Sequence, residues 1–88
     1  MSKSENLEIE FKKAAEKILK CNKNLDNDTL LKLYGLYKQS TIGDCNTDSP
    51  SFWMLRDKAK WDAWNNYKGF KKSNAQSTYI NLVSEITK

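Results

Sequence analysis

Two tyrosines and a lysine lie at helical spacing near the middle of the chain. Tyr34, Tyr37, Lys38 and Thr41 stand at positions i, i+3, i+4 and i+7, so on a helix they share one face. A tyrosine ring can stack on a nucleotide base and still hydrogen-bond through its hydroxyl, and lysine supplies a point charge suited to phosphate. The alternative is that both tyrosines border the hydrophobic core and that Lys38 is solvated.

A second basic group lies further along the chain, at the predicted start of another helix: Arg56, Lys58 and Lys60. These cations also suit phosphate oxygens, with a solvated, charged helix face as the alternative. We interpret Trp61 and Trp64 as core residues rather than as a ligand platform. For Tyr79, core packing with the hydroxyl reaching water is the alternative to a role in binding.

Several kinds of catalytic chemistry have no candidate residues in this chain. It contains no histidine, which removes the commonest general base and the Ser–His and Cys–His nucleophile pairs. Carboxylates or lysines could still catalyse, but no activated cluster of them is visible, and there is no glycine-rich phosphate loop. Cys21 and Cys45 fit neither a disulfide framework nor a metal cluster, so we expect free thiols, with one bridge as the alternative.

The composition is that of one small globular domain spanning residues 1–88. Hydrophobic residues make up 39% and charged residues 30%, which is ordinary for such a domain. The net charge of +4 favours anionic partners or serves solubility alone. The polar N-terminal segment does not read as a signal peptide, and no apolar run approaches the ~20 residues that span a bilayer. We therefore expect a cytoplasmic protein without an integral membrane segment.

Apolar residues recur at helical spacing in four stretches, and no stretch reads convincingly as a strand. We predict helices over residues 3–21, from 26 or 28 to 42, over 56–68 and over 74–87. Residues 43–55 form a long connection whose aromatic side chains argue against disorder. The sequence thus predicts an all-α bundle of four short helices.

Local signals predict where these helices begin and end. Asp26 or Asp28 would cap the start of the second helix, and Gly69 would stop the third. Gly35, inside the second helix, indicates close packing or the approach of a ligand, with plain tolerance of a glycine at this position as the alternative. Capping-box spacing occurs at the other two helix starts, in Ser2 with Glu5 and in Ser73 with Gln76.

Beyond these signals, the stretch LYGLYKQSTIGDCNTDSP (residues 33–50) with KAKWDAWN (residues 58–65) resembles the acyl-CoA-binding protein family. The similarity covers nearly the whole chain, and its central part needs no insertion or deletion. The resemblance implies a four-helix fold in up-down-down-up order, with a long overhand connection between the second and third helices. It also implies a carrier of medium- to long-chain fatty acyl-CoA that catalyses no reaction and needs no cofactor.

The resemblance carries the family's ligand contacts onto eight residues of this chain: Tyr34, Gly35, Leu36, Tyr37, Lys38, Arg56, Lys60 and Tyr79. We expect Tyr37 to stack on the adenine ring, and Lys38 and Lys60 to meet the phosphates. Tyr34 and Tyr79 would contribute hydroxyl contacts. Leu36 points away from this helix face, so only its backbone or an indirect role is expected.

Other residues predict how the acyl chain is held. Four apolar residues could border its groove: Phe11, Ala15, Leu30 and Leu31. Leu19 stands where the family usually has lysine, which would remove one cation near the phosphates, and Lys20 points about 100° away on a helix. The segment 51–54, with Phe52 and Trp53, is bulkier than is usual in the family and would set chain-length preference. Alternatively, Trp53 pins the connection onto the bundle.

Two other function classes compete with a carrier. A basic helical module could bind nucleic acid, but the cations are spread over all helices with acids between them, so we expect no nucleic-acid partner. A thioesterase acting on acyl-CoA would need a nucleophile that no motif supplies. We expect a monomer whose partners are fatty acyl-CoA and the enzymes that use it.

Overall fold

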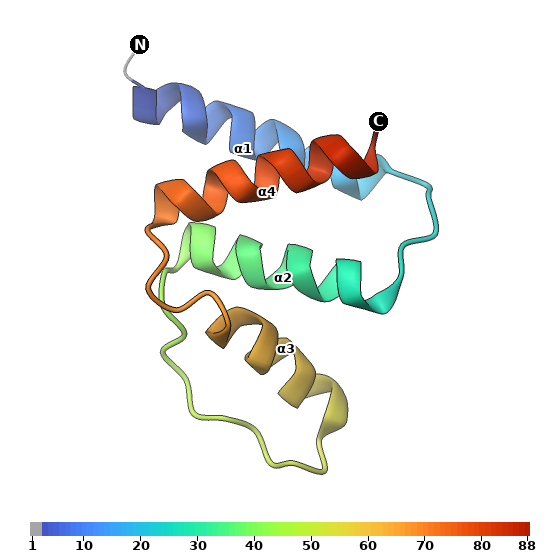
Figure 1. The fold of residues 1–88 in the computed structure, drawn as a ribbon, viewed down its shortest axis with the longest axis vertical. Coiled ribbons are helices and arrows are strands. Elements are labelled where there is room, and N and C mark those ends of the chain that lie inside the picture. The colour runs from blue at the N-terminus through green and yellow to red at the C-terminus, as the bar shows by residue number, and fades with distance from the viewer. Residues whose placement is uncertain (1–2) are drawn as a thin grey trace.

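The computed structural model describes residues 3–88, with side chains from residue 6 onward. The chain forms four helices: α1 (Lys3–Lys20), α2 (Asn27–Thr41), α3 (Leu55–Asn65) and α4 (Lys72–Ile86). Residues 3–88 contain no β-strand. α1 and α4 run in one direction and α2 and α3 in the other (Figure 1). The all-α fold, the up-down-down-up order and the long connection between α2 and α3 are confirmed.

α4 is the central element of the core. Both α1 and α2 pack on α4, whereas α3 packs on α2 alone. Within the described residues, no Cα atom of α1 comes within 8 Å of one in α2. The buried apolar cluster comes from α1, α2 and α4: Phe11, Ala14, Leu33, Leu36, Ala75, Tyr79 and Val83. α1 and α2 are therefore spread apart over α4, and their separation leaves space for a groove.

The start of α2 follows the predicted cap, and the start of α4 does not. The Asp26 carboxylate accepts a 2.8 Å hydrogen bond from the Thr29 N–H, and the bonds to Thr29 lower the pKa of Asp26. The predicted capping box of Ser73 and Gln76 is wrong, because α4 already begins at Lys72, before Ser73. Gln76 is buried instead, and its amide donates to a carboxylate oxygen of Glu8 and to the Ser40 carbonyl.

Two further boundary predictions have different outcomes. α3 ends at Asn65 rather than near residue 68. Gly69 lies in the turn that follows, with a φ of 93° that favours glycine. The predicted box of Ser2 and Glu5 lies outside the residues whose side chains the structure describes.

Two tryptophans of α3 hold the long connection, residues 42–54, in place. The Trp64 indole N–H donates to the Gly43 carbonyl at 2.8 Å, and that of Trp61 donates to the Thr47 carbonyl at 2.9 Å. Trp64 is also buried, as expected of a core residue, and Trp61 is half-buried. The alternative that Trp53 pins the connection is wrong, because 70% of its surface is exposed.

Asp44 ties the same connection to the turn before α4. Its carboxylate accepts hydrogen bonds from the Gly69 N–H and from the Gln39 side chain, both at 2.9 Å. These bonds, that of Gly69 first, lower the pKa of Asp44. The Gln39 amide also donates to the Phe70 carbonyl at 2.8 Å. The connection is therefore an ordered part of the fold.

Gly35 lies where α2 and α3 pack closely together. A Cβ atom built on Gly35 would lie 2.3 Å from the Ala63 carbonyl oxygen and 2.9 Å from the Tyr67 ring. Neither distance allows a side chain. Of the three interpretations of this glycine, close packing is confirmed, and this contact sets the position of α3 beside the tyrosine face of α2.

Candidate functional site

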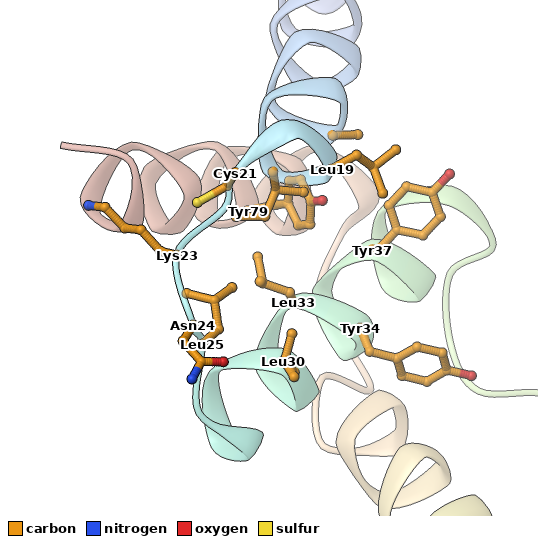
Figure 2. Close-up of a pocket in the computed structure, with 12 residues that line it drawn as sticks. Leu19, Cys21, Lys23, Asn24, Leu25, Leu30, Leu33, Tyr34, Tyr37 and Tyr79 are labelled. Atoms are coloured by element: carbon orange, nitrogen blue, oxygen red, sulfur yellow. The ribbon is translucent and has the colours of Figure 1, made fainter.

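An apolar groove of about 680 Å³ lies between α1 and α2, with α4 beneath it (Figure 2). It exists because the two helices diverge over α4. Residues from α1, the following connection, α2 and α4 line it: Ala15, Ile18, Leu19, Cys21, Lys23, Asn24, Leu25, Leu30, Leu33, Tyr34, Tyr37 and Tyr79. Most of these side chains are apolar or aromatic, so the groove is suited to a flat ring or a hydrocarbon chain.

Three aromatic rings meet at one end of this α1–α2 groove. Phe11 stacks on Tyr37 at 5.7 Å between ring centroids and meets Tyr79 edge-on at 5.1 Å. Tyr79 is 3% exposed, and burial, with a smaller contribution from Tyr37, raises its pKa. Tyr37 is 43% exposed. Tyr37 is thus the ring available to stack on a ligand, while Phe11 and Tyr79 hold it in place.

A second hollow, which we call the leucine hollow, opens between the first turns of α2 and α3. It encloses about 430 Å³ and is lined by Asn27, Leu30, Leu31, Tyr34, Leu55, Arg56, Ala59 and Lys60. The three leucines give it an apolar floor, and Arg56 and Lys60 border it with positive charge. Leu30 and Tyr34 belong to both this hollow and the α1–α2 groove, so the two are adjacent.

A third hollow also borders Tyr34, where α2, α3 and the long connection meet. Lys38 and Lys60 both line it. The Lys38 ammonium stands 4.6 Å from the Trp64 ring centroid, and that of Lys60 stands 5.4 Å from the centroid of Tyr34. Two carboxylates, Asp48 and Asp57, also line the hollow, so its formal charges balance. The aromatic faces hold both ammonium groups near Tyr34.

Figure 2 shows how Tyr34 and Tyr37 lie relative to the α1–α2 groove. Both project from the same face of α2, and their hydroxyls point away from the apolar part of the α1–α2 groove. Tyr34 lines all three spaces, so two adjacent apolar spaces and the hollow that holds Lys38 and Lys60 meet at this residue. Such a surface matches a ligand that combines apolar groups with anionic ones.

Six of the eight predicted contact residues border these three spaces: Tyr34, Tyr37, Lys38, Arg56, Lys60 and Tyr79. Gly35 and Leu36 do not. Gly35 faces α3, and Leu36 is 1% exposed within the core, in agreement with its predicted orientation. For both residues, contact through the backbone stays a prediction.

The four residues that were expected to border an acyl groove lie in different places in the structure. Ala15 lines the α1–α2 groove, Leu31 lines the leucine hollow and Leu30 lines both. Phe11 is a correction, since it is buried in the core beneath Tyr37. Neither Phe52 nor Trp53 lines any of the three spaces, so their effect on chain-length preference stays a prediction.

Sequence reasoning missed one wall of the α1–α2 groove. Leu19, at 84% exposure, lies along its rim. Four residues of the connection after α1 complete the wall: Cys21, Lys23, Asn24 and Leu25. A connection has no periodicity to reveal which side chains face a site; the exposed Leu19 at the end of an amphipathic helix was the one available signal.

The remaining chemistry of the described residues is limited. Cys21 and Cys45 are free thiols, as predicted. Residues 6–88 contain no cluster of three histidine, cysteine or carboxylate side chains that could hold a metal ion. None of the described helices is long and apolar enough to cross a bilayer.

Comparison with known proteins decides the family. The family model described as "Acyl CoA binding protein" matches residues 8–83. This chain belongs to the acyl-CoA-binding protein family. Acyl-CoA-binding protein homolog 1 of Caenorhabditis elegans is 45% identical over 78 residues, which cover 89% of this chain and 91% of that protein. Acyl-CoA-binding domain-containing protein 1 of Oryza sativa subsp. japonica is 44% identical over 80 residues, covering 91% and 88%.

Solved structures agree with this membership. The crystal structure of Oryza sativa acyl-CoA-binding protein 2 superimposes with a TM-score of 0.92 at 39% identity, covering 96% of this chain and 91% of that one. The crystal structure of the acyl-CoA-binding protein from Moniliophthora perniciosa gives a TM-score of 0.82 at 34% identity, covering 98% and 80%. The fold described above is therefore that of the acyl-CoA-binding protein family.

Proposed function

We propose that this protein binds medium- to long-chain fatty acyl-CoA esters and carries them between enzymes, without catalysing a reaction and without a cofactor. The observation that carries the proposal is the arrangement around Tyr34, where two apolar spaces meet a hollow that holds Lys38 and Lys60. Acyl-CoA combines the matching groups: an adenine ring and a hydrocarbon chain suit the apolar spaces, and its phosphates suit the two lysines. Family membership supports the same ligand.

The residues suggest how the ligand lies. Tyr37, which stacks on Phe11 and stays partly exposed, would stack on the adenine ring at the end of the α1–α2 groove. Lys38 and Lys60 would meet the phosphates beside Tyr34. The acyl chain would follow Leu31 and the rest of the leucine hollow. This assignment gives each part of the ligand the surface that matches its polarity.

The proposal extends to where the protein works and in what oligomeric state. It would act in the cytoplasm as a monomer, for which 30% charged residues and a net charge of +4 provide a suitably polar composition. Its partners would be the enzymes that supply and consume acyl-CoA. The lack of histidine supports a carrier over a thioesterase, and incubation with palmitoyl-CoA while free thiol is measured distinguishes the two.

Replacing Tyr37 by alanine is expected to weaken binding of palmitoyl-CoA by about 1–3 kcal/mol, the scale of one base stacked on an aromatic ring. Calorimetric titration of wild type and variant measures the difference, with free CoA and free palmitate as reference ligands. Tyr37→Phe keeps the ring and should retain most of the affinity. Wild-type affinity in Tyr37→Ala would remove Tyr37 from the site, and binding of palmitate as tight as that of palmitoyl-CoA would refute the proposal itself.

Lys60 is expected to act through the ligand's phosphates. Lys60→Ala should therefore lose more affinity for palmitoyl-CoA than for the analogue lacking the 3′-phosphate, by about 1.5–3 kcal/mol, the scale of a hydrogen bond to a charged group. Lys58→Ala is the matched control, because Lys58 lies on the same helix but pairs with Asp62. Equal losses with both ligands would place Lys60 away from the 3′-phosphate.

A further inference from the structure

Four consecutive apolar side chains project from the molecule where the long connection enters α3. We call Phe52, Trp53, Met54 and Leu55 the apolar tip. Phe52 is 83% exposed, Trp53 70% and Leu55 76%. In Figure 1 this part of the chain lies at the end of the molecule opposite α1. Small soluble proteins seldom expose such a group of large apolar side chains unless it contacts something.

The local backbone explains why these side chains point outward. The Met54 N–H donates to the Ser51 carbonyl at 2.9 Å, so residues 51–54 form a hydrogen-bonded turn with Phe52 and Trp53 at its corner. The tryptophans of α3 anchor the connection earlier, at Gly43 and Thr47. The aromatic pair is thus held outward by an ordered turn and does not fold back onto the bundle.

Charge and shape indicate what the tip contacts. Lys58 pairs with Asp62, which leaves Arg56 and Lys60 against the single carboxylate of Asp57 in residues 51–60, and the whole chain has a net charge of +4. Aromatic side chains next to cations are typical of segments that rest in the interface of an anionic bilayer. A second copy of the chain is a poorer match, because a stable dimer buries about 800 Å² on each partner, far more than four side chains at a projecting corner supply.

We propose that the apolar tip docks this protein onto anionic membranes, with Phe52 and Trp53 inserted at the level of the lipid headgroups. This interaction goes beyond acyl-CoA binding and does not depend on it. Leu55 belongs both to the tip and to the leucine hollow. Docking would therefore bring the leucine hollow next to the bilayer surface.

The test uses the full-length protein without acyl-CoA, sedimented with vesicles of equimolar phosphatidylcholine and phosphatidylserine. The double variant Phe52→Ser/Trp53→Ser should have a vesicle partition coefficient that is lower than that of wild type by about tenfold or more. Burying a single side chain of this kind already changes the coefficient by roughly that factor. Ile9→Ser, which changes an exposed apolar residue of α1, is the matched control and should bind as wild type does. Trp53→Phe should retain binding, and vesicles of phosphatidylcholine alone should bind wild type less.

Several results would overturn the proposal. Equal partitioning of wild type and the double variant would exclude the tip, and absence of wild-type binding would exclude docking altogether. A dimer in sedimentation equilibrium that disappears in the double variant, without vesicle binding, would assign the tip to a second copy of the chain. Thermal unfolding followed by circular dichroism checks that the variants are folded. Titration with octanoyl-CoA, which does not depend on docking, tests the carrier function separately.

Discussion

Leu36→Ala is expected to lower the free energy of unfolding by about 3 kcal/mol, within the usual range for a leucine truncated in a core. Leu36 is 1% exposed and lies in the cluster that joins α2 to α4, so the cavity left behind cannot be filled by solvent. For an 88-residue domain of ordinary stability, this is a large share of the total. Urea unfolding measures the change.

The same variant tests the role of Leu36 at the site. Because its side chain borders none of the three spaces, affinity for palmitoyl-CoA, corrected for the folded fraction, should stay close to wild type. Leu19→Ala is the matched control for stability, since Leu19 is exposed and should cost little on truncation. A large loss of affinity in folded Leu36→Ala would mean that this side chain helps to shape the site.

Gly35→Ala is expected to destabilise the protein by about 2–3 kcal/mol, the upper part of the range for overpacking. In an unconstrained helix the same change would be favourable by about 1 kcal/mol, so the predicted sign is opposite to helix propensity. The cause is the 2.3 Å separation between the new Cβ and the Ala63 carbonyl oxygen. Backbone cannot give way as a flexible side chain can, so α3 must shift away from α2.

This shift should also weaken ligand binding, because Arg56 and Lys60 are carried on α3 while Tyr34 and Lys38 are carried on α2. Lys32→Ala, an exposed substitution on the same helix, controls for the effect of alanine in α2 and should leave both properties unchanged. Calorimetry and urea unfolding report the two effects. A Gly35→Ala variant more stable than wild type would show that α2 and α3 pack less closely than they do in this structure.

Features fixed by local chemistry could be predicted from the sequence. Asp26 caps α2 because a carboxylate three residues before a free N–H is enough, and the apolar spacing of α1 and α4 identified the faces they bury. The predicted capping box of Ser73 and Gln76 is wrong because tertiary contacts hold the Gln76 side chain elsewhere. Gln76 is drawn into the interface with Ser40 and Glu8, and is not free to cap.

The packing of α2 shows the limit of reasoning from one helix face. α2 is covered by α4 on one side and by α3 on another, so Leu36 and Gln39 are buried in addition to Leu33. The periodicity indicated only the tyrosine side. At the site, residue type and spacing identified the tyrosines and cations. The groove wall after α1 depends on how far α1 and α2 diverge, which no local pattern encodes.

The attachment of α3 to the rest of the bundle has a consequence for motion. α3 packs on α2 alone among the helices, so it can detach while the core formed by α1, α2 and α4 stays intact. Backbone amides in α3 should therefore exchange with solvent through a local opening that requires less free energy than global unfolding. The leucine hollow lies between α2 and α3, so the opening that exposes these amides also widens the hollow. A molecule held in the hollow would slow that exchange by keeping α3 packed on α2.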